Sequence, residues 1–122
     1  MEVDVVVPVP LHKQRQRRRG FNQAALLARR FAQQVDLPVD EASLVRHRQT
    51  AAQVELNAEQ RKANVQDAFR CVSRGVVGKR VLLVDDVCTT GSTLEACATA
   101  LREGGAKSVQ ALTLARARGD GV

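Results

Sequence analysis

Residues 79–101 decide the fold and read KRVLLVDDVCTTGSTLEACATAL. Residues 79–84 are mainly apolar and partly β-branched, which predicts a buried strand that ends at two aspartates, Asp85 and Asp86. A short loop with one glycine, Gly91, comes next. Apolar residues then recur at the i, i+3, i+4 and i+7 spacing of a helix, namely Leu94, Cys97, Ala98 and Leu101. The stretch therefore predicts a strand, a loop and a helix in succession.

The rest of the chain continues this alternation. Residues 4–10 are a β-branched apolar run that Pro8 and Pro10 end, and a run without polar alternation is typical of a parallel strand covered on both faces. A helix is expected after Asn22, a suitable N-cap, along the apolar stripe Ala24, Leu27, Ala28, Phe31 and Val35. Further strands are expected at residues 37–46, 68–72 and 108–114. This order of elements predicts an α/β fold with a central parallel sheet flanked by helices.

Length and composition indicate one folded domain, residues 1–122. Hydrophobic residues make up 44% of the chain and charged residues 26%, and the net charge of +6 favours acidic partners such as phosphates or nucleic acid. An aromatic content of 2% argues against recognition of nucleic acid by base stacking. The three cysteines have neither disulfide nor zinc-site spacing, and the apolar runs are only strand-sized. A cytoplasmic protein without a membrane segment is therefore expected.

The loop after the central strand has the composition of a phosphate site. Residues 88–93 would present backbone N–H groups and a helix N-terminus to an anion. Gly91 allows the backbone to approach closely, and hydroxyl donors surround it at Thr89, Thr90, Ser92 and Thr93. Asp85 and Asp86 can accept hydrogen bonds from two vicinal hydroxyls, so a sugar phosphate suits both features. A plain strand-to-helix turn with hydroxyl caps and two solvated aspartates is the alternative that these residues leave open.

Residues 84–93, Val-Asp-Asp-Val-Cys-Thr-Thr-Gly-Ser-Thr, resemble the phosphoribosyl-pyrophosphate (PRPP) motif of type I phosphoribosyltransferases. Four more blocks resemble the competence-protein-F-like (ComF-like) branch of that family, at residues 7–12, 19–23, 50–53 and 61–64. The resemblance implies the type I phosphoribosyltransferase fold, a central parallel sheet flanked by helices with a flexible hood over the active site. Many ComF-like chains begin with a cysteine finger, which this sequence lacks, so the resemblance implies a shortened member or a fragment.

The resemblance also implies roles for individual residues. Asp85 and Asp86 would act as catalytic residues that hold the ribose hydroxyls of PRPP. The phosphate-binding residues would be Cys88, Thr89, Thr90, Gly91, Ser92 and Thr93, and the pyrophosphate loop would be Pro8, Val9, Pro10 and Leu11. Mg²⁺ would be carried by the diphosphate and the ribose hydroxyls rather than held in a protein cage. The implied reaction is loss of pyrophosphate from C1 of the ribose and attack by an unidentified nitrogen acceptor.

Residues 46–64 are polar and rich in glutamine, and they are expected to form a mobile lid over the site. From this segment Arg46 and Arg61 would act as catalytic residues, because their positive charge would stabilise the departing diphosphate. A glutamine-rich linker without a role in the active site is the alternative interpretation.

A basic patch lies between the first strand and the first helix, at Lys13, Arg15, Arg17, Arg18 and Arg19. It can be a rim of the active site, a surface that contacts the backbone phosphates of nucleic acid without base selection, or a solvated loop. ComF-like proteins resemble parts of the natural-transformation machinery. The second functional hypothesis is therefore a non-catalytic protein that retains the fold and binds single-stranded DNA. The resemblance also allows a homodimer, since type I relatives are commonly dimers.

Overall fold

A computed structural model describes residues 2–11, 22–46, 68–88 and 91–116 of the chain. The elements are β1 (Val5–Pro8), α2 (Gln23–Val35), β2 (Leu44–Arg46), β3 (Phe69–Cys71), β4 (Arg80–Cys88), α4 (Ser92–Glu103) and β5 (Ser108–Arg116). All the expected strands and helices are present, most of them within a few residues of the expected bounds. No helix in these described ranges is long and apolar enough to cross a membrane.

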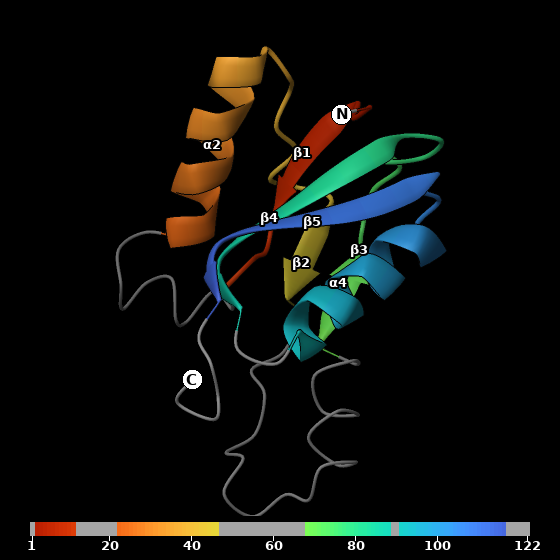
Figure 1. Ribbon diagram of the computed structural model, residues 1–122. Coiled ribbons are helices and arrows are strands. Elements are labelled where there is room, and N and C mark those ends of the chain that lie inside the picture. The colour runs from red at the N-terminus through yellow and green to blue at the C-terminus, as the bar shows by residue number, and fades with distance from the viewer. Residues whose placement is uncertain (1, 12–21, 47–67, 89–90, 117–122) are drawn as a thin grey trace, which may run out of the picture.

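Strands β1, β4 and β5 form a parallel sheet in the order β1-β4-β5, with α2 on one face and α4 on the other (Figure 1). This arrangement confirms the predicted fold class. The prediction that the central strand ends at the two aspartates is wrong, because β5 continues to pair with it. Asp85 lies opposite Thr113, and the ladder extends to Cys88 and Arg116. The aspartates are therefore part of β4 and not of the loop that follows.

Successive residues of β1 and β4 point to opposite faces of the sheet and enter two separate cores. The core under α4 combines strand residues with helix residues, among them Val5, Val7, Val81, Leu83, Ala96, Cys97, Ala100 and Leu101. The core under α2 contains Val6, Leu82 and Val84 together with Ala28 and Ala32. Because both faces are covered, the unbroken apolar runs of the two strands are buried throughout.

Helix α2 packs on the sheet through alanines. Its buried residues are Ala24, Ala25, Ala28 and Ala32. The larger Leu27 and Phe31 are only partly buried beside them. Val35, the last residue of the expected apolar stripe, is 45% exposed, because the helix ends there and Asp36 turns the chain with a left-handed φ of 56°. Small side chains at the contact let the helix lie close to the sheet.

Strands β2 and β3 pair with each other in an antiparallel sheet of their own, in which Arg46 lies opposite Phe69. The alternation of elements predicts that both strands join the parallel sheet, and this prediction is wrong. The reason is that the segment before β2 already occupies the outer edge of β1, where Val6 forms a parallel bridge to Val39. The small sheet lies on the α4 side of the molecule, and both of its strands contact α4 (Figure 1).

Candidate functional site

The described residues of the predicted site converge on one edge of the parallel sheet. In Figure 1, β1 and β4 end on the side of the molecule where α2 and α4 begin. Pro8, the last residue of β1, lies opposite Val84, and the Val9 N–H donates to the Val84 carbonyl at 2.9 Å. The beginning of the predicted pyrophosphate loop is thus held beside Asp85 on the neighbouring strand. Ligands of open parallel sheets commonly bind outside the carboxyl ends of the strands.

The two aspartates form a partly buried pair. The Asp86 N–H donates to Asp85 Oδ1 at 2.9 Å. The pKa of the Asp85 carboxyl is raised to about 7, chiefly by burial and next by a hydrogen bond with the Asp86 side chain, while the hydrogen bond from the Asp86 backbone acts in the opposite direction. Near neutral pH such a carboxyl can both accept and donate hydrogen bonds, which suits a ligand with vicinal hydroxyls.

Arg46 lies on the α4 side of the sheet, because its strand β2 contacts α4. It ends β2, and its guanidinium carbon lies 5.3 Å from the ring centroid of Phe69, its partner in the ladder. Because Phe69 is buried, this cation–π contact fixes the direction of the arginine. Burial raises the pKa of the Cys97 thiol, the charge of Asp85 adds to the rise, and the charge of Arg46 opposes it. The structure thus brings the charges of Arg46 and Asp85 within range of one buried thiol.

The N-terminus of α4 has the geometry of an anion site. Gly91 is its N-cap, with a φ of 83° and a ψ of −6°, and provides no side-chain cap. A Cβ at Gly91 would meet nothing within 4 Å, so glycine is required there by the backbone conformation and not by lack of space. Cys88 is the last residue of β4, and Ser92 and Thr93 are the first two of α4. The N–H groups and the dipole of such a terminus attract phosphate.

The predicted pyrophosphate loop contains few backbone donors. Pro8 and Pro10 have no N–H, and the N–H of Val9 is already donated to Val84. Of the four predicted residues, only Leu11 can therefore donate a backbone N–H to a diphosphate. A diphosphate at this position must take most of its hydrogen bonds from other groups.

A cavity of about 320 Å³ between α2 and the sheet reaches the same edge. It is lined by Leu27, Arg30, Phe31, Gln34, Val84, Asp85, Leu112 and Thr113. Arg30 and Gln34 were not predicted as site residues, because polar residues on an amphipathic helix are normally solvated. The signal that could have indicated them is the spacing of the four helix residues that line the cavity. Leu27, Arg30, Phe31 and Gln34 recur at i, i+3, i+4 and i+7 beside the buried alanines.

Several predicted residues lie outside the described residues: Arg61, Thr89, Thr90, and the basic patch of Lys13, Arg15, Arg17, Arg18 and Arg19. All of the predicted lid except Arg46 also lies outside them. Within the described ranges, no group of three or more His, Cys, Asp or Glu side chains could hold a metal ion. Asp85 and Asp86 are acceptors of the oxygen type found around Mg²⁺, so this end of the sheet suits a magnesium ion that the substrate itself carries.

The chain matches the phosphoribosyl transferase domain over residues 17–121 and belongs to that family. Two relatives are competence protein F of Haemophilus influenzae, 41% identical over 116 residues, and DNA utilization protein YhgH of Escherichia coli, 42% identical over 113 residues. These similarities confirm the resemblance to the ComF-like branch.

Each alignment covers 93% of this chain but only 51% and 49% of the two relatives, so the chain spans about half of their length. Among solved structures, the glutamine PRPP amidotransferase from B. subtilis complexed with ADP and GMP matches with a TM-score of 0.64. That match has 28% sequence identity and covers 93% of this chain and 23% of the amidotransferase. It supports the type I phosphoribosyltransferase fold.

Proposed function

We propose that residues 1–122 act as one domain that binds PRPP together with Mg²⁺ and transfers its phosphoribosyl group to a nitrogen acceptor. The observation that carries the proposal is the juxtaposition of three features on one sheet edge: the pair Asp85 and Asp86, the Gly91 start of α4, and the Val9 segment after β1. A ligand that spans them needs vicinal hydroxyls, a phosphate at one end and another anionic group at the other. PRPP has all three.

In this reaction the bond from C1 of the ribose to the diphosphate oxygen breaks, and pyrophosphate leaves with the bonding electrons. A nitrogen of the acceptor forms the new bond to C1 and releases its proton to solvent. Asp85 and Asp86 would hold the ribose hydroxyls, and the start of α4 would hold the 5-phosphate, so that C1 is oriented between them. Arg46 would place positive charge near the leaving group. Mg²⁺, when bound, would neutralise part of the diphosphate charge.

Calorimetric titration of PRPP into the wild type, with and without Mg²⁺, tests this proposal. We expect magnesium-dependent binding, which the double variant Asp85→Asn, Asp86→Asn should weaken by at least about 100-fold, because hydrogen bonds to carboxylates are charge-assisted. The double variant Asp36→Asn, Glu103→Gln is the charge-matched control, since it removes two exposed acids at the far ends of α2 and α4. Equal losses in the two double variants, or no binding to folded wild type, would contradict the proposal.

Nucleic-acid binding is a second candidate function, favoured by the basic patch and by the names of the two relatives. Binding of a labelled single-stranded oligonucleotide, followed by fluorescence anisotropy, should weaken steeply with salt. Four substitutions to glutamine, at Arg15, Arg17, Arg18 and Arg19, should lower the slope of log K against log salt by about 3. An unchanged slope would rule out the basic patch as the binding surface.

A further inference from the structure

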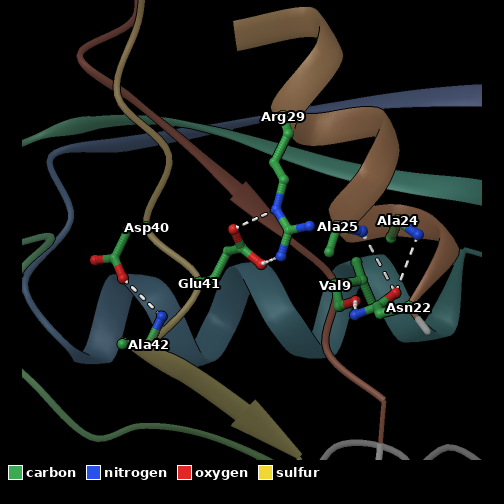
Figure 2. A network of polar contacts seen from close by, with 8 residues as sticks. All are labelled: Val9, Asn22, Ala24, Ala25, Arg29, Asp40, Glu41 and Ala42. Atoms are coloured by element: carbon green, nitrogen blue, oxygen red, sulfur yellow. Dashed lines mark hydrogen bonds and ion pairs between the residues drawn. The ribbon is translucent and has the colours of Figure 1, made fainter. Parts of the chain in front are cut away.

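Asn22 links the residue after β1 to the start of α2 through the oxygen and the nitrogen of its side-chain amide (Figure 2). Its Oδ1 accepts hydrogen bonds from the N–H groups of Ala24 and Ala25, at 3.0 and 3.4 Å. Its Nδ2 donates to the Val9 carbonyl at 3.2 Å, across 13 positions of the chain. An N-cap needs only the oxygen, and serine or aspartate would serve as well. Capping therefore does not explain the amide nitrogen.

With the hydrogen bond from Asn22, both the N–H and the carbonyl of Val9 have a partner. The N–H of Val9 is donated to Val84 in β4 at 2.9 Å, and its carbonyl accepts from Asn22 in front of α2. The next residue, Pro10, has its φ fixed by the proline ring. With Val9 held on both sides and Pro10 stiff, the chain leaves β1 in one direction. That direction sets where Leu11, two residues after Val9, enters the site.

Helix α2 does not need this bond to stay on the sheet. Ala28 and Ala32 are buried in the core under the helix. On its exposed side, Arg29 donates two hydrogen bonds to Glu41, at 2.8 and 2.6 Å (Figure 2). Loss of the bond from Asn22 to Val9 would therefore leave the helix in place and release only the chain that follows β1.

We propose that Asn22 is a positioning residue for the diphosphate: it holds the Val9 carbonyl so that the Leu11 N–H is directed at the diphosphate end of the ligand. This role rests on the proposed function. Asn22 acts through Val9 and does not touch the substrate. Its loss weakens binding of the diphosphate end and leaves the phosphate site at the start of α4 unchanged.

The variant Asn22→Ser separates capping from positioning. Serine caps a helix as well as asparagine, but its side chain is one heavy atom too short to reach the Val9 carbonyl as Nδ2 does. The probes are inorganic pyrophosphate with Mg²⁺ and ribose 5-phosphate, each titrated calorimetrically well below the melting temperature. Affinity for pyrophosphate should fall about three- to tenfold, the effect of one neutral hydrogen bond, and affinity for ribose 5-phosphate should stay the same. Gln23→Ala, at the neighbouring exposed position, should change neither affinity.

The outcomes distinguish this inference from the function on which it rests. A selective loss of pyrophosphate affinity in Asn22→Ser confirms the positioning role. Unchanged pyrophosphate affinity, or an equal loss for both ligands, overturns it while the proposed function stands. Wild type that binds ribose 5-phosphate but not pyrophosphate also overturns it. Wild type that binds neither ligand overturns the proposed function and the positioning role together.

Discussion

The variant Asp85→Asn should melt at a higher temperature than the wild type at pH 8 and bind PRPP roughly 30-fold more weakly. Binding weakens because the variant loses a charged acceptor for a ribose hydroxyl. Stability rises because the wild type keeps a carboxylate in a partly buried position, where burial raises the pKa of Asp85 to about 7. One substitution is thus expected to move stability and ligand affinity in opposite directions, as is common at binding sites.

The sign of the pH dependence follows from the two pKa values. In the unfolded chain an aspartate has a pKa of about 3.9, so between about pH 4 and pH 7 the folded protein holds a proton at Asp85 that the unfolded chain has lost. The free energy of unfolding of the wild type therefore falls as the pH rises through this window. Asparagine does not titrate. The gain in the variant should be near zero at pH 4 and reach on the order of 1–2 kcal/mol above pH 7, after allowance for solvent screening.

Thermal unfolding in half-unit steps from pH 4 to pH 9 measures this effect. The melting temperature of the variant should exceed that of the wild type by roughly 5 °C above pH 7, with the difference vanishing near pH 4. Asp36→Asn is the control, because Asp36 is exposed and asparagine tolerates its left-handed φ of 56°. A difference that does not change with pH would show that Asp85 does not titrate as a partly buried carboxyl.

The variant Gly91→Ala should lose at least about tenfold in affinity for ribose 5-phosphate and about 1 kcal/mol in stability. The stability cost arises because alanine at a φ of 83° adopts the left-handed conformation that a Cβ disfavours. The loss of affinity arises because Gly91 is the N-cap of the helix whose N–H groups would bind the phosphate, and strain there displaces them.

Gly78→Ala is a matched control for this second prediction. Gly78 has a similar φ of 72°, and a Cβ there would also meet nothing within 4 Å. It lies before β4, at the end of the strand away from Gly91, and its N–H donates to the Gly105 carbonyl at 2.8 Å. Both variants should therefore melt at similar temperatures below that of the wild type, while only Gly91→Ala should lose affinity for ribose 5-phosphate. Equal affinities of the two variants for ribose 5-phosphate would argue against a phosphate site at α4.

The parallel part of the fold could be predicted because its signals are local. An apolar run without alternation requires cover on both faces, and β1 and β4 received it from α4 and α2. The separate pairing of β2 and β3 could not be predicted, since it depends on which segment pairs with the outer side of β1. Val39 takes that edge, and nothing in the composition of residues 37–46 distinguishes a single bridge from a full strand.

The site shows the same division between local and distant information. The pair Asp85 and Asp86 and the glycine after it are contiguous in sequence, so their chemistry could be inferred from spacing. The contact of Arg46 with Phe69 and the bond of Asn22 to Val9 join residues far apart in the chain. Both depend on packing that only the folded backbone defines. The N-cap role of Asn22 was predicted and is confirmed, but its amide nitrogen carried no signal in the sequence.

The alanine contact between α2 and the sheet restricts how this helix can evolve. An alanine in a close contact can be trimmed only to glycine, which weakens the helix, and any larger residue overpacks the interface. Substitutions should therefore accumulate on the outward positions of α2. Arg30 and Gln34 are such positions, and they border the cavity that reaches Asp85. The packing of the helix thus constrains its alanines, whereas Arg30 and Gln34, on the helix side of the cavity, are under no such constraint.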